Sequence, residues 1–141
     1  MYHKVLIRYN KIMLNLNSIM LGTMQPKIMA KFYEEVFGRT PDMTEGDWAG
    51  WQVGSSFFSV GEHSEMKGES KEGGRVMFNL ETTEVRDEFK RISKIEGIKV
   101  IKEPYDMGGM EIATFADPDG NYFQLMSPWG DEVEEKVTLP N

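Results

Sequence analysis

The sequence predicts an α+β fold made of two similar halves, and three observations point to it. A strand pattern followed by a helical pattern occurs once in each half of the chain. Further short strand patterns follow each predicted helix. When the sequence is aligned with itself at a shift of 57 residues, residues 19–21 fall on residues 76–78 and Phe32 falls on Phe89. This internal repeat is weak, since any two strand–helix units match to some degree by chance.

The first half begins with a predicted strand over residues 15–23, where polar and apolar residues alternate. Pro26 then opens a predicted helix, in which four apolar residues recur at helical spacing until Gly38 ends it. Residues 47–54 and 56–63 are predicted to form two more strands, because aromatic and aliphatic residues dominate both segments and a glycine-containing turn joins them.

The second half begins after residues 61–74, which are polar and rich in glycine and therefore predict a linker. Residues 74–83 predict a strand, and residues 84–97 predict a helix that Gly97 closes. Three more strands are predicted at residues 99–105, 110–116 and 121–127. The sequence Asp117-Pro118-Asp119-Gly120 supplies turn residues between the last two.

Composition limits the class of protein. A chain of 141 residues is long enough for one domain with a substantial core. The absence of cysteine excludes disulfides, thiolate nucleophiles and thiolate metal sites. The formal net charge of −7 disfavours nucleic acids and anionic membranes as partners and favours a cationic ligand. No apolar run is as long as a membrane span, and we expect a cytoplasmic protein.

Two motifs carry a resemblance to a known group of proteins. The first is F-Y-x-x-V-F-G at residues 32–38, and the second is D-P-D-G-N at residues 117–121. With the order of predicted elements, they resemble the vicinal oxygen chelate superfamily, which comprises glyoxalase I, extradiol dioxygenases, fosfomycin-resistance enzymes and bleomycin-resistance proteins. The resemblance implies two βαβββ modules whose curled mixed sheets form a cup that holds a small molecule, and it implies a homodimer.

The resemblance also implies a division of the chain. A single glyoxalase/bleomycin-resistance-like domain is expected at residues 14–129, with module one at 14–62, the linker at 61–74 and module two at 74–129. Residues 1–13 are an N-terminal extension of undefined role, either an extra strand, a disordered arm or an unused upstream start. Residues 130–141 are an acidic tail.

Metal-dependent members of this superfamily place four ligands on the cup. By alignment of the motifs, these positions fall on Ser18, Ser59, Arg75 and Gln124. None is a histidine or a carboxylate, and a guanidinium repels a divalent ion. Gln124 alone would be tolerable, because glutamine serves as a ligand in some glyoxalases. The prediction is therefore that the chain has no metal site and no cofactor, with His63 as a solvated residue of the linker.

Strand alternation, with the face fixed by the resemblance, gives the residues of the cup. The predicted ligand-binding residues are Ser18, Met20, Trp51, Phe57, Ser59, Arg75, Met77, Asn79, Tyr122, Gln124 and Met126. Trp48 and Trp51 are predicted to lie on opposite faces of their strand, so one of them faces the cup or a dimer interface. The opposite face of the sheets is predicted to be apolar and to pack against the helices, through Ile19, Leu21, Phe58, Val60, Val76, Phe78, Phe123 and Leu125.

Arg75 is the one charge of the predicted cup. It either anchors an anionic group of a ligand or is neutralised by an acidic neighbour such as Glu111. The leading hypothesis is a non-catalytic protein, similar to the bleomycin-resistance branch, that binds a small aromatic or amphipathic molecule. The alternative is a metal-independent or atypical lyase, isomerase or dioxygenase of the same superfamily, with Tyr122 beside Arg75 as a candidate general acid. The sequence leaves open whether a reaction is catalysed.

Overall fold

The computed structural model describes residues 13–129. The predicted acidic tail and all of the predicted N-terminal extension except Met13 lie outside the described residues. Within this range the first βαβββ unit consists of β1 (Ser18–Thr23), α2 (Pro26–Phe37), β2 (Met43–Glu45), β3 (Trp48–Val53) and β4 (Ser56–Glu62). The second consists of β5 (Phe78–Glu81), α3 (Val85–Ile92), β6 (Lys99–Met107), β7 (Met110–Ala116) and β8 (Tyr122–Met126).

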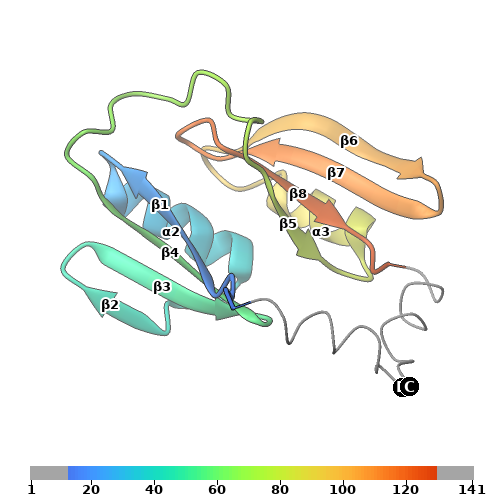
Figure 1. The fold of residues 1–141 in the computed structure, drawn as a ribbon. Helices are drawn as coiled ribbons and strands as arrows, with labels where there is room; N and C mark the ends of the chain where they lie inside the picture. Colours follow the sequence, from blue (N-terminus) through green and yellow to red (C-terminus); the bar gives the residue numbers. More distant parts are fainter. Residues whose placement is uncertain (1–12, 130–141) are drawn as a thin grey trace.

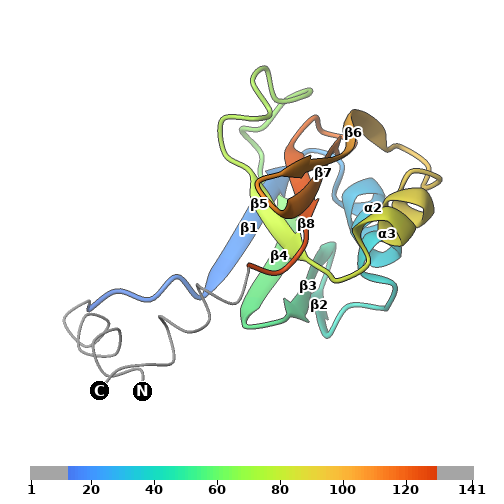
Figure 2. The ribbon, with the colours of Figure 1, turned by 90° about the vertical axis from the view of Figure 1, so that its right-hand side faces the viewer.

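Each unit forms a four-stranded mixed sheet of the same topology. The strand orders are β1-β4-β3-β2 and β5-β8-β7-β6, and in each sheet the first strand pairs with the last strand of its own unit in parallel. Figures 1 and 2 show both helices on the same side of the two sheets, which leaves the opposite faces of the sheets uncovered by helices. The predicted α+β fold of two βαβββ modules, with open sheets that form a cup, is confirmed.

Helix α2 shows how closely the local sequence determines where an element begins and ends. Pro26 occupies the first turn, where its missing N–H costs nothing because that group has no partner inside a helix. Gly38 ends the helix in the left-handed region with φ 72°, and its N–H donates to the carbonyl of Glu34 at 2.9 Å. Both boundaries were predicted from the sequence.

Three elements differ most from the prediction. Strand β2 was not expected from residue pattern, because its three residues are all exposed and carry no apolar alternation. Strand β5 begins only at Phe78, since residues 72–75 form a turn in which the Arg75 N–H donates to the Glu72 carbonyl at 3.0 Å. Helix α3 ends at Ile92, although Ile95 beyond it is still buried.

The faces of the sheets divide the side chains largely as predicted. Phe58, Val60, Phe123 and Leu125 are buried in the core beneath the helices, and Ile19, Leu21 and Phe78 pack against that core. The prediction for Val76 is wrong, because Val76 precedes β5 and its side chain is 81% exposed. The core is continuous between the modules, since the Tyr33 ring of α2 lies 5.9 Å from that of Phe123 and 6.2 Å from that of Phe78.

The two sequence motifs meet in this core. The Tyr33 hydroxyl donates a hydrogen bond to Asp117 Oδ2 at 2.6 Å, across 84 residues of sequence. The Asp117 carboxylate also accepts the backbone N–H groups of Asp119 at 2.9 Å and Asn121 at 3.0 Å, which fixes the turn before β8. Burial raises the pKa of Asp117, and these hydrogen bonds act in the opposite direction. Burial, followed by the Asp117 charge, raises the pKa of Tyr33 well above its ordinary value, so this hydroxyl keeps its proton.

The same turn holds the linker. The Ser70 N–H donates to the Asp119 carbonyl at 2.7 Å, and the Tyr122 N–H donates to the Gly73 carbonyl at 3.0 Å. A side chain at residue 73 has no room, since a Cβ there would lie 1.7 Å from the Gly120 carbonyl oxygen. The linker is therefore attached to module two at its final turn.

Candidate functional site

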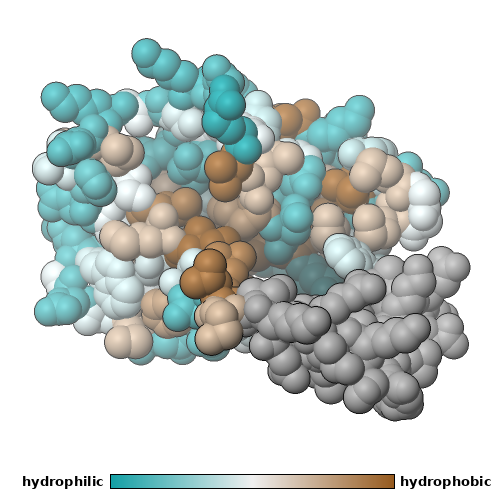
Figure 3. Space-filling model, viewed as in Figure 1, coloured by the Kyte–Doolittle hydropathy of each residue, from teal (hydrophilic) through white to brown (hydrophobic). Residues whose placement is uncertain are grey.

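The uncovered faces of the sheets carry the predicted cup. Strands β1 and β4 pair Ser18 with Phe57 and Met20 with Ser59, while β5 and β8 pair Asn79 with Gln124. Paired residues of neighbouring parallel strands point to the same side of a sheet. Figure 3 shows hydrophobic residues gathered in the middle of this face, with hydrophilic residues around them.

A groove with a volume of about 700 Å³ lies between the two modules. Its walls come from β1, from the β3–β4 turn with the adjoining strand residues, and from β5, so each module contributes one side. The lining is mainly apolar, with serine, asparagine and glutamate among it: Leu16, Ile19, Val53, Gly54, Ser55, Ser56, Phe57, Phe58, Met77, Phe78, Asn79, Leu80 and Glu81. Such a mixture suits a ligand that is apolar along most of its length and polar at one end.

Glu81 is the only ionisable side chain among these lining residues. It lies at the end of β5, two residues after Asn79 and thus on the same face. Among residues 13–129 no lysine, arginine or histidine forms a salt bridge with Glu81. The groove consequently carries a negative charge for which the described part of the chain supplies no counter-ion.

Aromatic rings continue from the groove onto module one. The Phe57 ring stacks on that of Trp48, with centroids 6.0 Å apart and an interplanar angle of 24°. Gly50 makes this possible, because a Cβ there would lie 2.4 Å from the Phe57 ring. Of the two tryptophans of β3, Trp48 therefore lies on the cup face.

The assignment of Trp51 to the cup is wrong. Its side chain is fully buried in the core on the opposite face of β3, where its ring lies 5.4 Å from that of Phe37. Its indole N–H donates to the Arg39 carbonyl at 3.0 Å, so the polar atom of the ring is satisfied inside the protein.

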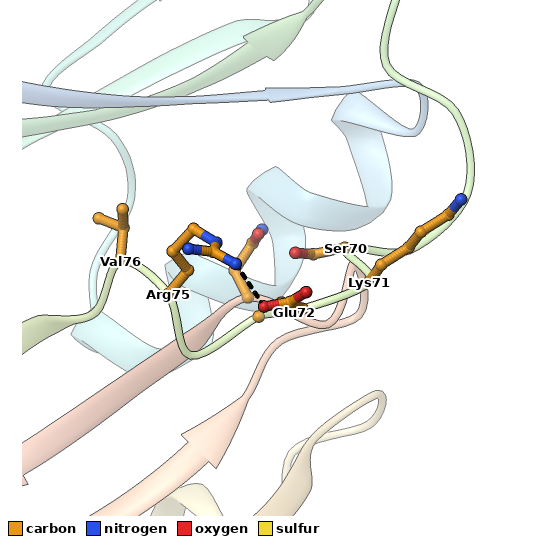
Figure 4. A pocket seen from close by; sticks show the side chains of 7 residues that line it. Ser70, Lys71, Glu72, Arg75 and Val76 are labelled. Carbon is orange, nitrogen blue, oxygen red and sulfur yellow. Dashed lines mark hydrogen bonds and ion pairs between the residues drawn. The ribbon is translucent and has the colours of Figure 1, made fainter.

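Arg75 does not belong to the groove. It lines a second, shallower hollow of about 410 Å³ together with residues of the linker and Asn121. Figure 4 shows its guanidinium directed to Glu72, at 2.6 Å, while Lys71 points away. The Arg75 side chain is 73% exposed, and its acidic partner is Glu72 rather than Glu111, which pairs with Arg86 at 2.6 Å.

Gln124 and Tyr122 are engaged by other groups. The Gln124 Nε2 donates to the Thr114 hydroxyl at 3.0 Å, across the β7–β8 pair. The Tyr122 ring lies against Gly73 and Gly74, close enough that a Cβ on Gly74 would be 2.9 Å from it. Gln124 is thus fixed within its own sheet, and the Tyr122 ring covers the end of the linker.

The four superfamily ligand positions do not fit a divalent metal. Ser18, Ser59 and Arg75 lack imidazole, carboxylate and thiolate groups, the Arg75 guanidinium is paired elsewhere, and the Gln124 amide nitrogen is turned to Thr114. Across residues 13–129 no three side chains of histidine, cysteine, aspartate or glutamate converge as a metal site would require.

The predicted residues are therefore only partly brought together. Phe57, Met77 and Asn79 line the groove, whereas Arg75 lines the other hollow and Trp51 lies in the core. Ser18, Met20, Ser59, Tyr122, Gln124 and Met126 lie on β1, β4 and β8 outside the groove lining. Sequence reasoning missed Glu81, although the alternation that gave Asn79 leads to it two residues later.

The fold and the open cup are those of a glyoxalase-like protein. The family described as "glyoxalase-like domain" matches residues 18–126, and the chain belongs to this family. No match was found among curated proteins. In the residues described, no helix is long and apolar enough to cross a membrane.

Solved structures of several other proteins share this fold. A glyoxalase-related enzyme from Fulvimarina pelagi is 19% identical, with 84% of this chain and 94% of that chain covered and a TM-score of 0.69. A glyoxalase/bleomycin resistance protein/dioxygenase family enzyme from Burkholderia phytofirmans PsJN is 22% identical, with coverages of 81% and 98% and a TM-score of 0.64. TioX from Micromonospora sp. ML1 is 17% identical, with coverages of 81% and 98% and a TM-score of 0.61.

Proposed function

We propose that this protein binds a small amphipathic molecule in the groove between its modules, without transforming it. The observation that carries the proposal is an apolar groove whose single ionisable lining residue is Glu81. Apolar walls favour an aromatic or aliphatic body, and a carboxylate favours an amine or another cationic hydrogen-bond donor at one end. The net charge of −7 adds a long-range attraction for cations.

This ligand class replaces the anion that Arg75 suggested from the sequence. Arg75 lies in the other hollow and is paired with Glu72. Glu81 is the one ionisable side chain among the groove residues, and acid–base catalysis generally uses a second positioned group. A binding role is thus better supported than the lyase, isomerase or dioxygenase alternative. Similar folds in proteins described as bleomycin resistance proteins are consistent with sequestration of a small molecule.

The test compares three probes of one shape by isothermal titration calorimetry. 1-Naphthylmethylamine, 1-naphthylmethanol and 1-naphthylacetic acid share an aromatic body and differ in charge. We expect the amine to bind several-fold more tightly than the alcohol, and the acid to bind most weakly. Glu81→Gln should remove the preference for the amine while leaving affinity for the alcohol unchanged.

The matched control is Glu45→Gln, which removes the same charge from an exposed position on β2 outside the groove. If Glu81→Gln and Glu45→Gln lost the preference for the amine to the same extent, the preference would be due to net charge alone. Tight binding of the acid would contradict the proposed ligand class. If Phe57→Ala bound each probe with the same affinity as the parent protein, the proposed groove would be contradicted.

A further inference from the structure

Two glycines lie side by side near the C-terminal ends of β1 and β4. Gly22 of β1 and Gly61 of β4 are register partners in a parallel pair, and they follow Met20 and Ser59 on the cup face. Neighbouring strands lie about 4.8 Å apart, so the two missing side chains leave one small bare area of sheet. This area is distinct from the groove, because neither glycine lines it.

Four side chains from three parts of the chain cover this area. A Cβ built on Gly61 would lie 2.8 Å from Cδ1 of Trp48 and 3.3 Å from Cε of Met20. A Cβ built on Gly22 would lie 3.4 Å from Cγ of His63 and 3.5 Å from Cγ of Met66. The side chains of two methionines, one histidine and one tryptophan therefore lie over two adjacent backbone positions.

Backbone hydrogen bonds hold the two linker residues of this cluster in place. The His63 N–H donates to the Thr23 carbonyl at 3.0 Å, and the Met66 N–H donates to the His63 carbonyl at 3.0 Å. The His63 Nδ1 accepts the Glu65 N–H at 3.2 Å, which places the ring proton on Nε2. Binding of a cation at Nε2 therefore requires the other tautomer, with the proton on Nδ1, and the loss of this exposed hydrogen bond. Solvent reaches the cluster, since Met20 is 56% and Met66 is 42% exposed.

We propose that Met20, His63 and Met66 form a binding site for a soft monovalent cation, Cu(I) or Ag(I), with the indole of Trp48 beside it. Thioether sulfur and imidazole nitrogen are ligands that select soft ions over Mg²⁺ or Ca²⁺, which require oxygen. The indole face adds an attraction for the cation. The site uses none of the four superfamily ligand positions, and binding involves no change of oxidation state.

The experiment uses the full chain carrying His3→Ala, so that His63 is the one histidine present. Silver nitrate is titrated in chloride-free buffer, and Cu(I) is supplied anaerobically from its bicinchoninate complex. We expect one ion per chain. With ¹³C-methyl-labelled methionine, the Met20 and Met66 methyl resonances should shift at one equivalent, while the remaining methionine methyls should not.

Near-isosteric variants separate binding from folding. Met66→Leu and His63→Gln should each weaken the Ag(I) affinity at least tenfold, with unchanged thermal stability in the absence of metal. Met24→Leu is the control, because Met24 is 49% exposed and lies outside the cluster, and it should bind as the parent does. Binding of the ion beside Trp48 should change the tryptophan fluorescence of the parent protein. Trp48→Phe should still bind one ion but should not show this fluorescence change. Two results would overturn the proposal: methyl resonance shifts spread over many methionines, or equal Ag(I) affinity of Met66→Leu and Met24→Leu. The cluster would then serve only as packing that attaches the linker.

Discussion

Replacing Tyr33 by phenylalanine removes a single oxygen from the core and disconnects the two sequence motifs. The ring would keep its packing, including the contact with Phe58 at a centroid distance of 4.7 Å. Asp117 Oδ2 would retain only the Asn121 side-chain amide, at 3.2 Å. The variant therefore isolates the hydrogen bond between helix α2 and the turn before β8.

The expected cost follows from the nature of this bond. Hydrogen bonds to charged groups contribute about 1.5–3 kcal/mol, and a buried carboxylate that loses a donor lies near the middle of that range. We expect the free energy of unfolding at pH 7 to fall by about 2 kcal/mol, which for a chain of this size corresponds to about 4–8 °C in Tm. Tyr105→Phe is the control, since the Tyr105 hydroxyl is exposed and its one hydrogen bond among the described residues goes to Met107 Sδ, at 3.9 Å.

The cost should depend on pH. Burial raises the pKa of Asp117, so its contribution to stability is full below the pKa of the unfolded chain and is lost as pH rises through the folded pKa. The Tyr33 hydrogen bond lowers that folded pKa. Its removal raises the pKa of Asp117 further and penalises the ionised form, and hence Tyr33→Phe should cost more at pH 7 than at pH 3.

Urea denaturation at both pH values, followed by fluorescence and circular dichroism, measures these differences. Parent, Tyr33→Phe and Tyr105→Phe should unfold with equal m values, and only Tyr33→Phe should shift the midpoint substantially at pH 7. If both variants lose less than about 0.5 kcal/mol, the hydrogen bond contributes no more than an exposed hydroxyl. A larger loss at pH 3 than at pH 7 would refute the assignment of an ionised Asp117 as the acceptor.

Three further predictions concern the linker, the metal positions and the assembly. Gly73→Ala should destabilise the protein by several kcal/mol in the same denaturation assay, because its Cβ would overlap the Gly120 carbonyl oxygen; an unchanged midpoint would contradict the close approach of these two segments. Addition of EDTA should leave Tm unchanged, since among the four superfamily positions only Gln124 has a side chain that serves as a ligand in relatives, and a clear fall in Tm would reveal a structural divalent ion. Light scattering should give a homodimer, twice the 16.2 kDa chain, because the open sheets leave edge strands uncovered; a monomer at micromolar concentration would refute this.

Local sequence was sufficient for most elements of the fold. Pro26 and Gly38 delimit α2 because each has a backbone property that acts within one turn of a helix. Strand β7 was predicted at the residues where it occurs, since its apolar run is bounded by turn residues. Strand β2 gave no such signal, because all three of its residues are exposed and its position depends on pairing with β3.

The candidate site was harder to predict because it depends on how the modules meet. Alternation placed Trp48 and Trp51 on opposite faces, but the choice between them depends on the register with β4, which pairs Trp51 with the core residue Phe58. Arg75 was assigned to a strand, whereas the turn at residues 72–75 directs it to Glu72. The groove itself lies between β1 and β5, which belong to different sheets and share no hydrogen-bonded ladder.

The hydrogen bond between Tyr33 and Asp117 also constrains the order in which the protein is assembled during synthesis. The two groups are separated by 84 residues, so helix α2 is made long before its partner leaves the ribosome. Contacts that close such long loops form slowly, and the hydrophobic face of a nascent segment remains accessible until they do. Nascent module one should therefore be a substrate for chaperones until the final hairpin emerges, and ribosome-bound chains that end before residue 117 should be more sensitive to protease within residues 26–38 than chains released at full length.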